Sequence, residues 1–225
     1  MKAQLLFLSV LFSLSLSAQI RPDSVAVQPD SILTGTHHSL SYVRPAWYWR
    51  PVSWMAQYQD LTLREQIEYG VSYFDIRLRF KKNKVISGHG FIDYNIDVLD
   101  VLQTLDSITS RPIYVRILYE SRPLSKNPPM EQLAAFIDSL EAAYPRLIFL
   151  YSYLKSPYTR IKSGAAVPVQ ILHPYYKNYG AKSGWQKLKG LRLPLPKRAA
   201  RRNNREYWMA VDSAKINVFD FVEIK

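Results

Sequence analysis

Hydrophobic and polar positions follow two periods along the chain, and the two periods alternate after residue 61. In one set of segments apolar residues alternate with polar ones or run on unbroken, which predicts β-strands; these are residues 71–80, 112–120, 147–151, 167–172 and 216–224. A second set has apolar residues three and four positions apart, which predicts helices; these are residues 62–69, 96–108 and 130–144. The alternation of the two sets predicts an α/β fold with a largely parallel sheet.

The helices carry recognisable local signals. Thr62 is followed three residues later by Glu65, a capping-box pattern, and Gly70 suits the left-handed conformation after a helix end. The apolar stripe of the second helix is Val98, Val101, Leu102, Leu105 and Ile108, and that of the third is Leu133, Phe136, Ile137 and Leu140.

The strand predicted at 71–80 has a polar face. Its apolar side is expected to pack on helices, which leaves Asp75 and Arg77 pointing together into a polar space. In the strand at 112–120, Arg116 and Glu120 likewise share a face, and at 216–224 Asp220 shares one with two valines. A half-buried surface strand would alternate in the same way, and Asp75 with Arg77 could form an ion pair that has no chemistry.

Parallel barrels and open α/β sheets both keep their active sites at the ends of strands, where these polar residues lie. An eight-stranded barrel typically needs ~250 residues. This chain has 225 residues including its N-terminal segment, so the sequence predicts a distorted or incomplete parallel (β/α) barrel of the TIM type.

The N-terminal segment predicts export. Residues 1–18 read as a signal peptide, residues 19–30 as a flexible lead-in, and residues 31–225 as one catalytic barrel. A membrane anchor is the alternative, but the apolar run is shorter than the ~20 residues that span a bilayer. We therefore expect a secreted or periplasmic protein, associated with the membrane surface.

Composition and charge limit the kinds of site and of binding partner that the chain can have. The absence of cysteine excludes disulfides, thiol catalysis and cysteine-based zinc sites. The net charge of +12, much of it within 185–208, favours an anionic partner. Because export argues against nucleic acid, membrane lipid is the expected target, although a basic surface can also serve only for solubility.

Aromatic residues gather in two segments, 45–55 and 174–185. Tryptophan and tyrosine prefer the bilayer interface, and lysines in the second segment would be attracted to anionic headgroups. The alternative is that these aromatic residues belong to the core.

Two of the four histidines stand together in "LTGTHHSLSY", and a third lies in "SGHG". Two imidazoles with an arginine suit acid–base chemistry on a phosphodiester, because His37 and His89 could take and give protons while Arg77 binds the phosphate. Taken singly, each histidine is more simply explained as a structural or surface residue.

The segments "GTHHS", "WMAQYQDLTLREQIEYGVSYFDIRLRF", "VISGHG" and "PIYVRILYE" resemble, in order and spacing, the X-domain of the bacterial phosphatidylinositol-specific phospholipases C. The resemblance covers residues 33–120 and resumes weakly at "VPVQILHPY" and "INVFDFVEI". It implies a distorted barrel in which the inositol 2-hydroxyl attacks the phosphodiester, giving diacylglycerol and a cyclic inositol phosphate.

The resemblance also implies roles for individual residues. His37 is similar to the general base, His89 to the general acid, and Arg77 to the phosphate-binding arginine of the metal-independent enzymes, so neither metal nor cofactor is expected. Asp75 resembles part of the same support network, and Asp220 resembles the aspartate that orients the base. The expected substrate-binding residues are Glu120, Arg116, His38, His173 and Tyr175.

Two positions depart from the family pattern. His38 stands where the family has an aspartate that partners the acid histidine, and His173 with Pro174 replaces basic residues. Two other hypotheses therefore stay open: an inactive relative that binds lipid headgroups or polyanions, and a phosphodiesterase for another glycerophosphodiester.

Overall fold

The computed structural model describes residues 32–82, 84–108, 111–122, 125, 128–151, 160–161, 169–172, 185–188 and 191–224. The predicted signal peptide, 1–18, and lead-in, 19–30, lie outside these ranges. Within them, no helix has the length and apolar character needed to cross a membrane.

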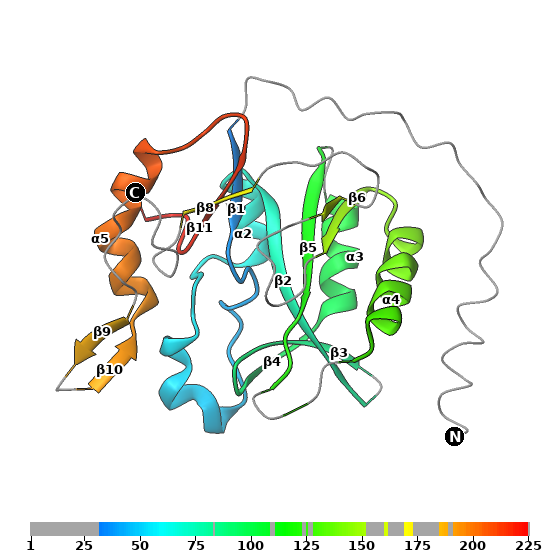
Figure 1. Cartoon of the computed structure of the whole chain (residues 1–225), viewed down its shortest axis with the longest axis horizontal. Helices are drawn as coiled ribbons and strands as arrows, with labels where there is room; N and C mark the ends of the chain where they lie inside the picture. Colours follow the sequence, from blue (N-terminus) through cyan, green and yellow to red (C-terminus); the bar gives the residue numbers. More distant parts are fainter. Residues whose placement is uncertain are drawn as a thin grey trace.

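Nine strands form one sheet in the order β7-β6-β5-β2-β1-β11-β8, with β3 added to β2 and β4 to β3 (Figure 1). They are β1 (Leu33–Thr36), β2 (Val71–Lys81), β3 (Lys84–His89), β4 (Ile92–Asp97), β5 (Ile113–Tyr119), β6 (Leu147–Tyr151), β7 (Arg160–Ile161), β8 (Val169–Leu172) and β11 (Ile216–Phe219). The strands from β6 through β8 in this order pair in parallel, and β7, β3 and β4 add antiparallel pairs. In the described part of the chain β7 and β8 do not pair with each other, so the curled sheet is an incomplete barrel, which confirms the predicted fold class.

The helices are α2 (Leu63–Glu68), α3 (Val98–Ile108), α4 (Met130–Ala143) and α5 (Pro196–Met209), and the 3₁₀ helix η2 spans Trp47–Met55. The helices lie around the sheet, with α3 and α4 near β5 and β6 and with α5 at the opposite edge, near β8 and β11 (Figure 1). A separate antiparallel hairpin comprises β9 (Trp185–Leu188) and β10 (Leu191–Pro194). The basic segment 185–208, whose order the sequence did not reveal, therefore contains a hairpin and the helix α5.

The predicted faces of the central strands are confirmed. Phe74, Ile76 and Leu78 of β2 are buried in the main core with the stripes of α3 and α4. The opposite face of the sheet contributes Tyr73 and Val218 to a smaller cluster inside the curl. Burial of side chains of this size is worth about 1.5–3 kcal/mol each, so these two clusters stabilise the two faces of the curled sheet.

Local signals at α2 are also confirmed. The Thr62 hydroxyl accepts a hydrogen bond from Glu65 N, and the Glu65 carboxylate accepts one from Thr62 N. Gly70 has φ 102°, the left-handed conformation expected after the helix. The stripe of α3 is wrong at one position, because Ile108 is exposed at the helix end.

One prediction of strand extent was wrong, and two strands were not predicted. The segment "VISGHG" forms most of the strand β3, which folds back on β2 and pairs with β4, so both add antiparallel pairs to the largely parallel sheet. The closing strand ends at Phe219, because Phe221 has φ 46° and leaves the extended conformation. Asp220 therefore follows the strand instead of lying on one of its faces.

Candidate active site

Parallel pairing brings the first candidate pair together. Thr36 at the end of β1 is in register with Phe219 at the end of β11, so the next residues, His37 and Asp220, are neighbours. His37 Nδ1 lies 2.7 Å from Asp220 Oδ1. An ionised carboxylate can only accept, so Nδ1 carries the proton and Nε2 keeps its lone pair. This tautomer leaves His37 able to accept a proton at Nε2.

The loop that carries Asp220 is held by α5. The Asn204 side-chain amide donates hydrogen bonds to the main-chain oxygens of Asp220, Phe221 and Ile224. Burial raises the pKa of Asp220 well above its usual range, an effect that nearby Arg77 opposes. The short hydrogen bond from His37 also favours the carboxylate, so proton uptake by His37 would stabilise this buried charge.

Arg77 lies between the two histidines. Its Nη2 is 2.5 Å from His37 Nε2, and its Nη1 is 2.9 Å from His89 Nδ1. Burial alone would lower the pKa of Arg77, but the carboxylates of Asp75 and Glu120 raise it, so the guanidinium stays charged. One planar cation thus faces both imidazoles.

His89 returns to this place because β3 runs antiparallel to β2, with Leu78 in register with Ser87. Its Nδ1 lies 2.8 Å from Glu120 Oε1. Arg77 Nη1 approaches the same nitrogen, but a guanidinium only donates and cannot bond to a protonated nitrogen. We assign the Nδ1 proton to the Glu120 bond, while Arg77 Nη1 donates to Glu120 Oε2 at 2.7 Å.

The other nitrogen of His89 faces Tyr58. Nε2 lies 3.3 Å from the hydroxyl of Tyr58, and the imidazole is 26% exposed. Tyr58 was not among the residues proposed from the sequence, because it lies in the irregular segment after η2, where no periodicity marks its direction.

Asp75 is buried beneath Arg77. It accepts from Arg77 Nε at 3.4 Å, from Arg116 Nη1 at 3.3 Å and from the main-chain N–H of His38 at 3.0 Å. Burial raises the pKa of Asp75, but the two arginines lower it by more, so its pKa lies below the usual range. Arg116 therefore contacts Asp75, the same carboxylate that holds Arg77.

His38 is fully buried and has φ 47°. Its ring packs against those of Tyr58, Tyr94 and His89, with centroid distances of 5.6, 5.4 and 5.0 Å respectively. Among the described residues, neither ring nitrogen has a hydrogen-bond partner of ordinary geometry, although the backbone of Gly88 lies near enough to favour the protonated form. Burial first, and then the charges of Arg77 and His89, lower the pKa of His38 well below 6.5, so this ring is neutral at pH 7.

This burial predicts a pH-dependent loss of stability. Below about pH 6.5 the unfolded chain binds a proton at residue 38 that the folded protein does not. As the pH is lowered below that value, the free energy of unfolding falls by up to about 1.4 kcal/mol per pH unit. His38→Asn, which tolerates a positive φ, should lack this component in urea unfolding at pH 7 and pH 5. Equal pH dependence of the two proteins would contradict the burial of a neutral ring.

The structure thus gathers seven residues expected from the sequence. They are His37, His38, Asp75, Arg77, His89, Glu120 and Asp220. Arg116 reaches them through Asp75, whereas His173 and Tyr175 lie outside the described residues. Among the described residues, no three histidine, aspartate or glutamate side chains are placed to hold a metal ion together.

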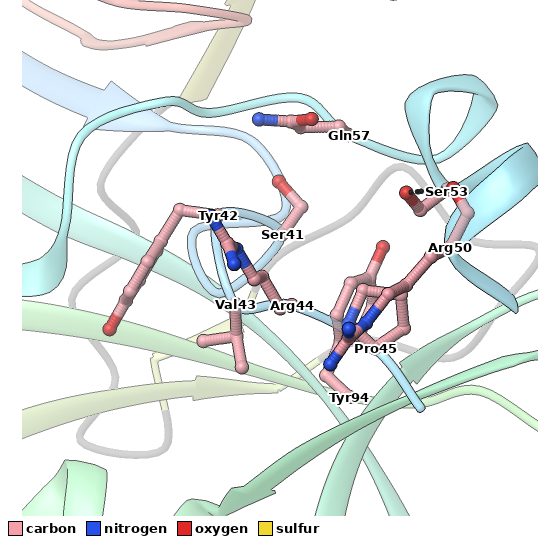
Figure 2. A pocket seen from close by; sticks show the side chains of 9 residues that line it. All are labelled: Ser41, Tyr42, Val43, Arg44, Pro45, Arg50, Ser53, Gln57 and Tyr94. Carbon is pink, nitrogen blue, oxygen red and sulfur yellow. Dashed lines mark hydrogen bonds between the residues drawn. The ribbon is translucent and has the colours of Figure 1, made fainter. Parts of the chain in front are cut away.

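A cavity of about 300 Å³ lies beside η2 (Figure 2). Its lining comprises Ser41, Tyr42, Val43, Arg44, Pro45, Arg50, Ser53, Gln57 and Tyr94. His37, His89 and Arg77 do not line this cavity, although Tyr94 lines it and also contacts the ring of His38. The cavity is therefore adjacent to the polar cluster and separate from it.

Comparison with known proteins identifies structures that share this fold but no relative by sequence. No family model matches the sequence, and no curated protein matches it. The phosphatidylinositol-specific phospholipase C of Listeria monocytogenes superposes with a TM-score of 0.55 at 16% identity, covering 86% of this chain and 89% of its own. A variant of the phosphatidylinositol-specific phospholipase C of Staphylococcus aureus gives a TM-score of 0.58 at 14% identity, covering 84% of each chain. The chain therefore has the fold of the bacterial phosphatidylinositol-specific phospholipases C.

Proposed function

We propose that the chain is an exported phosphodiesterase that cleaves an inositol phospholipid or a related glycolipid. The observation that carries this proposal is the placement of one guanidinium between two imidazoles, with Arg77 within 3 Å of both His37 and His89. Such a cation can hold a phosphate with an acid on one side and a base on the other.

In the proposed reaction the phosphate displaces Arg77 from His37 Nε2. That nitrogen then takes the proton of the inositol 2-hydroxyl, whose oxygen forms a new bond to phosphorus. The bond from phosphorus to the glycerol oxygen breaks, and protonated His89 gives its Nε2 proton to that oxygen. The products are diacylglycerol and a cyclic inositol phosphate, and Arg77 neutralises the charge that grows on the phosphate.

Phosphorus NMR of the full chain with phosphatidylinositol in mixed micelles, in the presence of a metal chelator, tests this proposal. We expect a cyclic phosphodiester signal, because a neighbouring hydroxyl attacks and Arg77 supplies the positive charge. A linear phosphomonoester formed without a cyclic intermediate would contradict the proposed nucleophile.

The two other hypotheses predict different spectra. A binding protein without turnover would leave the lipid signal unchanged while the protein stays folded. A phosphodiesterase for another lipid would leave phosphatidylinositol intact but cleave a different glycerophosphodiester. The absence of an aspartate at position 38 does not by itself favour either hypothesis. His38 is neutral, but His89 has a carboxylate partner in Glu120.

We further propose that η2 contacts the membrane surface that holds the substrate. Trp47 is 76% exposed, and Tyr48 and Trp54 are exposed on the same helix. Aromatic rings of this kind favour the bilayer interface, and Arg44 and Arg50 of the adjacent cavity would favour anionic headgroups.

Double substitution of Trp47 and Tyr48 by alanine should weaken sedimentation with anionic phospholipid vesicles about tenfold, because two interfacial anchors are removed. The matched control is Met209→Ala on α5, whose side chain is also 76% exposed. An equal loss in both proteins would show that η2 has no special part in vesicle binding.

A further inference from the structure

The partner of His89 is built into the fold more firmly than a substrate contact would require. Glu120 is the first residue after β5, and its carboxylate is buried. Oε1 accepts from Gly90 N at 2.7 Å and faces His89 Nδ1, while Oε2 accepts from Arg77. Both oxygens are thus committed to protein groups.

The main chain at both ends of this contact is fixed by Arg79. Its Nε donates to the Glu120 carbonyl oxygen at 2.7 Å, and its Nη2 donates to the Gly90 carbonyl oxygen at 2.6 Å. The guanidinium fits because residue 88 is glycine: a Cβ there would lie 2.7 Å from Arg79 Nη1. The Nη1 group also holds Asp93 at 2.8 Å, which fixes Arg79 itself.

Residue 38 cannot take the same role. His38 faces His89, but its buried ring is neutral and has no carboxylate to offer. Glu120, in contrast, is charged: burial would raise its pKa, but hydrogen bonding from His89 and the nearby Arg77 cation lower it far below the usual range. Besides Glu120, the titratable groups that face His89 from the described part of the chain are Arg77, His38 and Tyr58.

We propose that Glu120 is the positioning residue of the acid histidine, holding the Nδ1 proton of His89 so that Nε2 points to the leaving group. This proposal rests on the proposed function and changes the role expected for Glu120 from the sequence, where it was assigned to substrate binding. When His89 gives up its Nε2 proton, the Nδ1–H tautomer that remains is the one that Glu120 already binds.

Kinetics of Glu120→Gln separate positioning from substrate binding. Loss of the negative charge should lower kcat about tenfold to a hundredfold and move the alkaline limb of the kcat/KM profile about one unit to lower pH. KM should change little, because no substrate contact is removed. A raised KM with an unmoved alkaline limb would overturn the proposal and return Glu120 to substrate binding.

Nitrogen-15 NMR of the histidine rings gives a readout that needs no turnover. The chain has four histidines, so His89→Gln identifies the signals of His89 by their loss. At alkaline pH we expect the Nδ1–H tautomer in the wild type and a mixture of tautomers in Glu120→Ala. An unchanged tautomer in Glu120→Ala would overturn the proposal even if the protein cleaves inositol lipid.

The matched control is Asp106→Asn on α3, which removes another buried carboxylate, one that contacts the side chain and the main-chain N–H of Arg146 and neither Arg79 nor His89. We expect the tautomer of His89 and the alkaline limb to stay as in the wild type. A shift equal to that of the Glu120 variants would mean that overall charge, and not the direct contact, governs His89, and it would also overturn the proposal.

Discussion

His37→Ala and His89→Ala should each lower turnover of phosphatidylinositol by about 10²–10⁴-fold, because each removes one of the two proposed proton transfers. The measurement is initial-rate kinetics in mixed micelles, with phosphorus NMR to identify the product. The turnover rate of the double variant should be only slightly below that of the less active single variant, since the two imidazoles act on one transition state. Full activity in both single variants would remove the basis of the acid–base assignment.

The same two variants should differ in stability. His37→Ala removes the donor that lies 2.7 Å from Oδ1 of the fully buried Asp220, whose other oxygen, Oδ2, has no hydrogen-bond partner among the described residues. An unsatisfied buried acceptor costs about 1–3 kcal/mol, so urea unfolding should show a loss of this size. His89 is more exposed, and its replacement should have a smaller effect. Asp220→Asn is the control, because an asparagine can keep a hydrogen bond to His37.

The sequence predicted the residues whose position depends on local periodicity. Asp75 and Arg77 share a face of β2 because side chains alternate along any strand, and their separation from the core at Phe74 and Ile76 follows from the same rule. The cap of α2 was equally local, since Thr62 and Glu65 are three residues apart. These features needed no knowledge of how the strands pair.

Long-range pairing decided what the sequence could not predict. Asp220 meets His37 only because β11 lies beside β1, and Glu120 meets His89 only because β3 folds back along β2. The sequence pattern gave His89 no partner after the change at position 38, whereas the structure supplies one from the end of β5. The helix α5 was not predicted either, because its buried face consists mainly of alanine and asparagine instead of large apolar residues.

Arg77→Lys should lower kcat about a hundredfold or more, although the charge is kept. The guanidinium reaches His37 with Nη2, His89 and Glu120 with Nη1, and Asp75 with Nε, so its planar fork fixes the spacing of the whole site. A lysine ammonium is a single point that cannot make these contacts together. Arg116→Lys is the control, because Arg116 contacts the same Asp75 but should lose less activity. Equal losses would mean that charge near Asp75, and not the fork, is what matters.

The proposed binding of the phosphate by Arg77 also predicts how activity depends on metal ions. If the guanidinium supplies that charge, the wild type keeps its rate in a calcium chelator, and Arg77→Asp is inactive without added metal. Arg77→Asp would place a third carboxylate beside Asp75 and Glu120, and oxygen ligands of this kind bind calcium. Calcium should therefore restore part of the activity of Arg77→Asp while leaving Arg77→Ala inactive. A wild type that stops in chelator would contradict the arginine as the phosphate-binding cation, because the charge at the phosphate would then come from a bound metal.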